Sequence, residues 1–219
     1  LEFRRVLFRS MSLALKVVDG IEPLYGEKLG AYGEKILRDI SNNIKLGNTL
    51  VSKQSSFSAD EIEKTKPLHI EKAFKDIFEK ENGFRYIVGN PPYVETKFYK
   101  ADNPVMHAYL SKHYKAFEKK ADLTILFLER SLELLCKNGQ TGFIIQKRWF
   151  KAEYGKTIRN IISENGYLDT LIDFSANDLF KGKQTYVAIL ILGKEAKSEF
   201  EYQLLHEDRD TIKTLFENA

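Results

Sequence analysis

Apolar positions along the chain follow two patterns, which alternate from the middle of the sequence to its end. Short stretches rich in apolar residues, typical of strands, occupy residues 84–89, 141–146 and 168–174, and an unbroken apolar run occupies residues 185–192. Apolar residues at helical spacing occupy residues 67–80, 123–137 and 151–165. Asp122 and Gly139 flank the middle helix as its expected cap residues. Strands that alternate with helices predict an α/β fold with a largely parallel sheet.

The last two predicted strands differ from the others in their connection. Only about ten residues without a helical pattern join them, whereas a parallel pair needs a crossover of about a dozen or more. We therefore predict that this pair is antiparallel. After Gly193 the chain becomes highly charged, which indicates an exit from the domain. The domain is expected to extend over residues 11–193, with residues 194–219 as a charged segment that leads out of it.

Weaker patterns leave the rest of the chain less regular. We expect the end of a helix at residues 11–18, a loop with some helix after it at 20–35, a short strand that runs into a loop at 44–51, a surface connection at 52–66, and a long loop or insertion at 94–121. Residues 1–10, LEFRRVLFRS, precede Met11 and resemble adaptor-derived sequence, so they are set aside.

Composition changes this interpretation little. Of the 219 residues, 43% are hydrophobic and 30% are charged, which is typical of a soluble globular domain. No apolar run approaches the roughly 20 residues of a membrane helix. The single cysteine, Cys136, excludes an internal disulfide and favours a reducing, cytoplasmic setting. The four histidines lack metal-ligand spacing, so no metal site is predicted.

The candidate chemistry lies in the stretch YIVGNPPYVE, residues 86–95. Asn90 follows a strand, and ligands of open α/β sheets bind beyond the carboxyl ends of strands. Pro91 and Pro92 have fixed φ angles and no N–H, so they make a stiff elbow. This elbow aims the Asn90 side-chain oxygen and the Pro91 carbonyl at one point, which suits a planar amino group. Tyr93 offers a flat ring on which a base can stack.

These residues resemble a known family. NPPY after an apolar strand resembles the catalytic motif of amino-group methyltransferases that use S-adenosylmethionine. NIKLGNTLV, ADLTILFLERSLELLCKNGQTGFIIQKRWF and LDTLIDFSANDLFKGKQTYVAILILGK resemble further family segments in the expected order. The resemblance covers roughly residues 40–193 and is closest to adenine-specific DNA methyltransferases of single-chain restriction–modification and phage-defence systems. It implies a partial Rossmann-like methyltransferase fold with a mixed sheet, an antiparallel last strand and no first strands.

The resemblance also implies roles for individual residues. Asn90 and the Pro91 carbonyl, supported by Pro92, would hold the exocyclic amine of an adenine flipped out of double-stranded DNA. Tyr93 would stack on one face of the base and Phe180 on the other, with Tyr186 as a weaker candidate. Asn48 falls where relatives place an acidic contact to the cofactor.

One departure from the family pattern concerns the cofactor. No glycine-rich loop follows a strand, and the acidic residue that would hold the ribose is missing as well. We therefore expect a piece of a longer protein, in which the strand at 84–89 is an exposed apolar edge. The chain alone is expected to be poorly soluble and not to bind the cofactor. The oligomeric state, the recognition sequence and the presence of a nuclease are left open.

Simpler interpretations stay open for several residues. Phe180 and Trp149 are also typical of buried core aromatics, and Asn48 of a turn. Lysines and arginines after the motif and around residues 147–159 suit either phosphate contacts or a solvated surface. The same motif serves enzymes that methylate a glutamine side chain of release factors. RNA adenine methylation and an inactive DNA-binding domain are further alternatives.

Overall fold

The computed structural model of the chain describes residues 43–52, 57–118, 120–174 and 186–205. The chain divides into two compact units, Leu1–Asn48 and Thr49–Ala219. Residues 44–46 have no regular secondary structure, and residues 47–51 form bends and turns with one bridge residue at Asn48, so the strand predicted there is wrong. The elements below all belong to the second unit.

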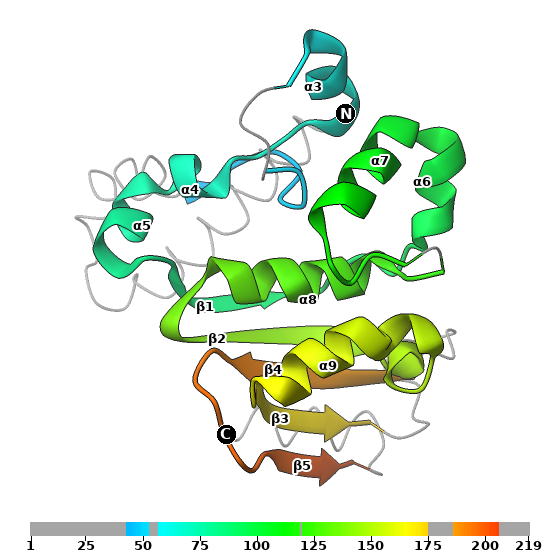
Figure 1. Ribbon diagram of the computed structural model, residues 1–219. Helices are drawn as coiled ribbons and strands as arrows, with labels where there is room; N and C mark the ends of the chain where they lie inside the picture. Colours follow the sequence, from blue (N-terminus) through cyan, green and yellow to red (C-terminus); the bar gives the residue numbers. More distant parts are fainter. Residues whose placement is uncertain (1–42, 53–56, 119, 175–185, 206–219) are drawn as a thin grey trace, which may run out of the picture. The chain divides into compact units, whose positions relative to one another are not determined.

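A five-stranded sheet forms the centre of this unit (Figure 1). Its strands, in chain order, are β1 (Phe84–Gly89), β2 (Leu135–Gln146), β3 (Leu168–Asp173), β4 (Val187–Gly193) and β5 (Glu201–Leu204). Their order across the sheet is β1-β2-β4-β3-β5. β1 runs parallel to β2, and β4 is antiparallel to both of its neighbours. The predicted antiparallel pairing of the last two apolar strands is therefore confirmed.

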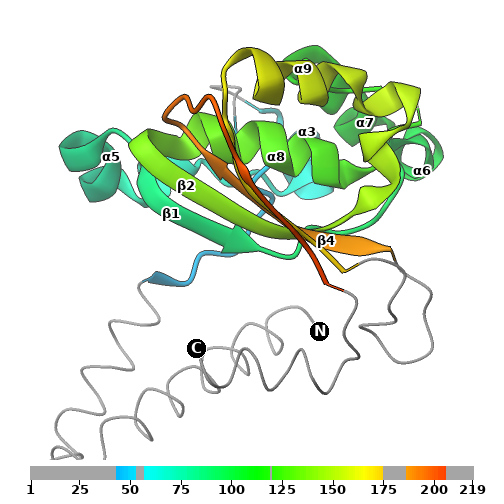
Figure 2. The same cartoon turned by 90° about the horizontal axis from the view of Figure 1, so that it is seen from below.

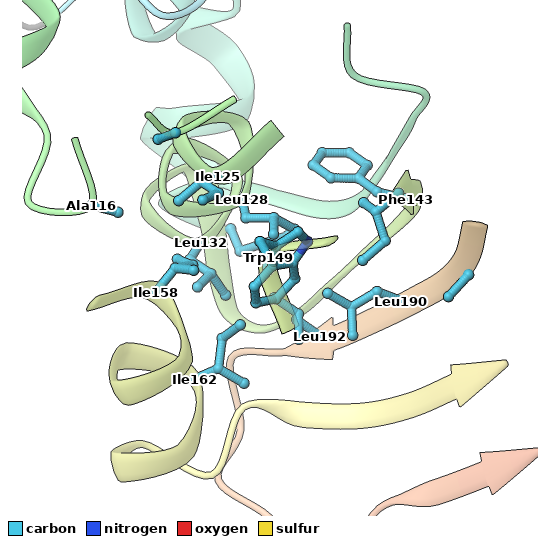
Figure 3. Packing of buried hydrophobic residues seen from close by; sticks show 14 residues of the cluster. Ala116, Ile125, Leu128, Leu132, Phe143, Trp149, Ile158, Ile162, Leu190 and Leu192 are labelled. Carbon is cyan, nitrogen blue, oxygen red and sulfur yellow. The ribbon is translucent and has the colours of Figure 1, made fainter. Parts of the chain in front are cut away.

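Two helices, α8 (Leu123–Leu134) and α9 (Lys156–Glu164), lie on one face of this sheet (Figure 2). Their apolar side chains meet alternate residues of β2 and β4 in one core, which Figure 3 shows. Phe143 and Ile145 of β2 point into this core because successive residues of a strand face opposite sides. Trp149 is 2% exposed within the same core, as expected for a buried anchor.

The turn that leads into β1 requires a glycine. Gly83 has φ of 142°, and a Cβ at this position would lie 2.6 Å from the backbone nitrogen of Cys136. Any side chain would therefore separate β1 from the start of β2. Because Leu135 adopts extended geometry, α8 ends at Leu134 rather than at residue 137.

Two helices lie in the region 94–121, which was predicted to be a long loop or insertion. They are α6 (Thr96–Asp102) and α7 (Pro104–His113), and they correct the prediction of a loop. The Asn103 side chain caps α7 by accepting the backbone N–H of Met106 at 3.0 Å, and Pro104 occupies the first turn. Three residues of α7 are buried in a second apolar cluster with the first turn of α8; they are Met106, Tyr109 and Leu110.

Two further predictions, for residues 52–66 and 67–80, are also corrected. The expected connection at 52–66 contains α3 (Ala59–Thr65), which begins with a capping box between Ser58 and Glu61. The helix expected at 67–80 is divided into α4 (Ile70–Ala73) and α5 (Lys75–Glu81).

The two edge strands of the sheet bear on two expectations. The predicted exit after Gly193 is wrong for β5, because its residues return to pair in parallel with β3. β1 is exposed, as expected for residues 84–89: Tyr86 is 69% and Val88 85% exposed. β1 is first in the strand order, so none of the described residues pairs with its outer edge. No helix among the described residues is both long and apolar enough for a membrane span.

Candidate functional site

Asn90 and the two prolines follow β1 at the edge of the sheet where parallel β1 and β2 both end. Gly89 lies opposite Phe143 of β2, and a Cβ at Gly89 would come within 3.2 Å of the Phe143 ring. The glycine thus lets an aromatic ring pack directly under the elbow. Pro91 is buried, whereas Asn90 is exposed, so the elbow is anchored and its carboxamide remains accessible.

The Tyr93 hydroxyl connects this elbow to the neighbouring strand. It lies 3.0 Å from Asn90 Oδ1 and 3.2 Å from the backbone oxygen of Ile144. A phenol has one proton, so it donates to one of these acceptors at a time. A carboxamide oxygen has two lone pairs, so Asn90 Oδ1 can accept from Tyr93 and from one further donor.

The segment after the motif is fixed to the start of α8. Glu95 and Asp122 form an antiparallel bridge, with the Thr96 N–H donating to Ala121 O at 2.7 Å and the Leu123 N–H donating to Val94 O at 2.8 Å. Because these bonds join the motif to the core helix, they restrict movement of Tyr93.

Burial raises the pKa values of Tyr93 and Asp122 at the motif. Desolvation raises the pKa of Tyr93, and the nearby Asp122 raises it further, so the phenol stays a neutral donor. Asp122 is 6% exposed, and burial raises the pKa of its carboxyl. In contrast, the hydrogen bond from Lys97, at 2.7 Å, is the main cause of the lowered pKa of Glu95.

A cavity of about 390 Å³ opens beside the elbow. Its walls are mostly apolar and include the rings of Phe127 from α8 and Phe143 from β2. Asn90, Pro91 and Pro92 form its rim on the β1 side. A cavity of this size and lining suits a flat organic ligand.

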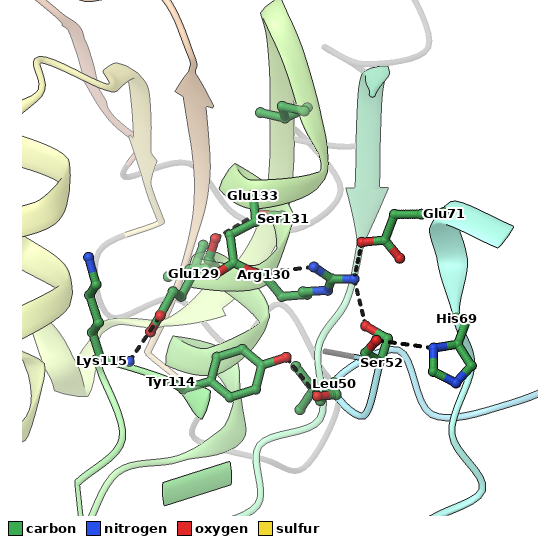
Figure 4. A network of polar contacts seen from close by, with 12 residues as sticks. Leu50, Ser52, His69, Glu71, Tyr114, Lys115, Glu129, Arg130, Ser131 and Glu133 are labelled. Atoms are coloured by element: carbon green, nitrogen blue, oxygen red, sulfur yellow. Dashed lines mark hydrogen bonds and ion pairs between the residues drawn. The ribbon is translucent and has the colours of Figure 1, made fainter. Parts of the chain in front are cut away.

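Arg130 lines the same cavity and is held in a polar network (Figure 4). Its guanidinium donates to Ser52 Oγ at 2.6 Å, to Glu71 Oε1 at 2.7 Å and to Glu133 Oε2 at 3.2 Å. Two carboxylates therefore offset its charge within a mostly apolar wall. Arg130 was not among the predicted site residues, although a cation within the apolar pattern of α8 was a visible signal.

The remaining predicted site residues are not brought to the motif by the described structure. Phe180 lies outside the described residues. Asn48 is half-buried and belongs to the first compact unit, which is described by itself. Tyr186 is 57% exposed before β4. No group of three histidine, cysteine or acidic side chains suited to a metal ion occurs in the described ranges.

Comparisons with known proteins identify the family of the chain. The model of the Eco57I restriction-modification methylase family matches residues 4–180, which include part of the segment set aside at 1–10. The type II restriction enzyme and methyltransferase RM.Eco57I of Escherichia coli is 33% identical over 88% of this chain and 18% of its own length. The type II methyltransferase M.PaeR7I of Pseudomonas aeruginosa is 34% identical over 62% of this chain and 23% of its own length.

A solved structure also resembles the chain: the type ISP restriction-modification enzyme LlaGI, with a TM-score of 0.48 and 17% identity. The match covers 68% of this chain and 17% of that one. The chain thus spans about a fifth of the length of the relatives it matches. The predicted resemblance to S-adenosylmethionine-dependent methyltransferases of restriction–modification systems is confirmed at the level of the family. Because the family model covers most of the 219 residues, the chain belongs to the family of Eco57I restriction-modification methylases.

Proposed function

We propose that this chain carries the catalytic elbow of an enzyme that transfers a methyl group from S-adenosylmethionine to the exocyclic amine of adenine in DNA. The observation that carries the proposal is the exposed Asn90 carboxamide at the rim of a cavity, on an elbow anchored by buried Pro91. Family membership supports methyl transfer, and the acceptor pair supports an amino-group substrate.

The elbow acts by accepting hydrogen bonds. Asn90 Oδ1 and the Pro91 carbonyl would each accept one hydrogen of the amine, which draws the nitrogen toward tetrahedral geometry. The nitrogen lone pair, otherwise delocalised into the ring, is then available for direct attack on the methyl carbon. Positioning and exclusion of water account for most of the rate in such a mechanism.

Tyr93 would cover one face of the flipped base. Stacking of a base on an aromatic side chain contributes about 1–3 kcal/mol. The hydroxyl lies within hydrogen-bond reach of Asn90 Oδ1 and Ile144 O, so the end of the ring is held beside the elbow before DNA binds. Phe180 remains the proposed partner for the other face.

The cavity beside the elbow fits the flat adenine ring of S-adenosylmethionine. Pro92, Phe127 and Phe143 would contact the ring through their apolar surfaces. The ion pairs of Arg130 with Glu71 and Glu133 reduce its repulsion of a cationic ligand. When bound, this cofactor supplies an activated methyl group on a sulfonium centre. A contact from Asn48 to the cofactor is part of the same proposal.

The experiment measures methyl transfer by the full natural protein that carries this chain. We expect this enzyme to act in the cytoplasm. Labelled S-adenosylmethionine is offered with duplex DNA, RNA of the same sequence, or a release factor with a free glutamine side chain. The proposal requires label in DNA, recovered as N6-methyladenine after digestion to nucleosides. Label confined to RNA or to the release factor, or no label in any substrate, would refute it.

A further inference from the structure

A second cavity, of about 520 Å³, opens at the carboxyl end of β2. Three cations line it: Lys147 and Arg148 begin the 3₁₀ helix η2 (Lys147–Phe150), and Lys151 follows that helix. Its other polar lining residues are Gln146, Asp173 from the end of β3 and Tyr186 before β4. The mechanism proposed above does not use this cavity.

Lys147 forms the fixed floor of the cavity. Its ammonium is ion-paired with Asp173, and both side chains are 18% exposed. It also lies 5.9 Å from the centroid of the Tyr186 ring, and its backbone N–H donates to Tyr186 O at 2.9 Å. The Asp173 carboxylate offsets this charge, so Lys147 shapes the cavity more than it attracts a ligand.

Arg148 and Lys151 are the accessible cations of the cavity. The Arg148 side chain is 66% exposed, and its contact to Glu95 Oε1, at 3.5 Å, is at the limit of a hydrogen bond. Exposed pairs of this kind contribute little, so a stronger acceptor displaces Glu95 readily. The planar guanidinium can bind two oxygens of a phosphate at once, and an exposed lysine adds a point charge.

This cavity is next to the catalytic elbow. The Tyr93 hydroxyl contacts the backbone oxygen of Ile144, and Gln146, two residues further along β2, already lines the cavity. Two residues of a strand advance about 7 Å. A nucleotide whose base rests on Tyr93 therefore brings its own sugar-phosphate backbone to the mouth of the cavity.

We propose that Arg148 and Lys151 bind backbone phosphates of the DNA strand that carries the flipped adenine. The inference rests on the proposed function, because it takes the base position from Tyr93. Such contacts fix the position of the strand and carry no sequence information. The ion pair of Lys147 with Asp173 keeps η2 in place, so that both cations face the strand.

The test uses the full natural protein and a duplex of about two helical turns that contains adenines. The double variant R148Q/K151Q is compared with R85Q/K80Q, a matched pair of exposed cations at the opposite end of β1. The slope of log affinity against log salt should fall by about 1.8 in R148Q/K151Q, that is about 0.9 for each lost phosphate contact. The control should keep the wild-type slope.

An unchanged slope in R148Q/K151Q, or an equal change in both double variants, would overturn the inference. Methyl transfer by the wild type is measured in parallel, so the two proposals can fail separately. If the wild type transfers no methyl group but the salt slope falls in R148Q/K151Q and not in the control, the phosphate contacts stand and the proposed function fails. If the wild type methylates DNA and the slope does not change, the phosphate contacts fail alone.

Discussion

The substitution Tyr93→Phe isolates the role of the hydroxyl that connects the elbow to β2. Phenylalanine keeps the stacking ring but removes the donor that lies 3.0 Å from Asn90 Oδ1 and 3.2 Å from Ile144 O. A net hydrogen bond of this kind contributes about 0.5–1.5 kcal/mol. If the bond orients the carboxamide for the amine, its loss lowers the rate of methyl transfer by about 2- to 13-fold.

Single-turnover methyl transfer at saturating DNA and cofactor measures this effect, and DNA affinity is measured separately. The ring remains, so DNA affinity should not change. Tyr167→Phe, which removes the hydroxyl of a half-buried tyrosine beside the main core, is the matched control and should keep the wild-type rate. An unchanged rate in Tyr93→Phe would show that the hydroxyl does not orient Asn90. A faster rate would show that the hydroxyl competes with the substrate for the same oxygen.

Three further predictions concern the fold around the site. Val88→Lys should increase the fraction of the protein that stays in solution after centrifugation, because Val88 is 85% exposed on edge strand β1 and lysine opposes edge pairing. An unchanged soluble fraction would indicate that β1 is covered. Glu129→Gln should lower the free energy of unfolding by about 1–3 kcal/mol, measured by denaturant titration. The reason is that the two carboxylate oxygens accept hydrogen bonds from the backbone N–H groups of Lys115 at 2.9 Å and Ala116 at 2.8 Å. An unchanged free energy of unfolding would contradict this prediction. Asp122→Asn should raise the melting temperature more at pH 8 than at pH 3. Burial raises the folded-state pKa of Asp122 above about 3.9, so ionisation costs stability as the pH rises; an equal shift at both pH values would oppose this.

The sequence predicts the two inner strands of the sheet because both contain buried apolar residues. Phe143 and Ile145 of β2 and Ala188, Leu190 and Leu192 of β4 lie in the core, and both strands have other strands on either side. β1 was located with its observed bounds, Phe84–Gly89, since Gly83 and Asn90 end its apolar run. Its exposure follows from its place at the edge of the sheet, which the comparison with the family pattern led us to expect.

The helices and strands that the sequence did not predict bury few apolar side chains. The four residues of β5 alternate between polar and apolar types, but the stretch is short, all of it is exposed, and it lies in a highly charged segment, so it was not recognised as a strand. α7 buries only three of its ten residues, and the many polar residues around them obscured the helical period. For α3 the signal was present: the Ser58–Glu61 capping box can be recognised from spacing alone.

In the candidate site, contacts between neighbouring residues could be predicted from the sequence, whereas contacts between distant residues could not. The Asn90–Tyr93 motif is contiguous, so its chemistry can be inferred from four neighbouring residues. The contact from Tyr93 to Ile144 joins residues 51 positions apart, and only the folded sheet brings them together. The network around Arg130 likewise joins it to Ser52 and Glu71, both more than 50 residues away.

The central claim is that Asn90 holds the amine that receives the methyl group, and Asn90→Ala tests it most directly. In the full natural protein, the rate of N6-methyladenine formation is compared with the wild type, and DNA affinity is measured in the same preparations. Removal of one preorganised hydrogen-bonding group at a reacting centre typically costs about 10²–10³ in rate. We predict a loss of at least this size with unchanged DNA affinity. Wild-type rates of methyl transfer in Asn90→Ala would contradict the account.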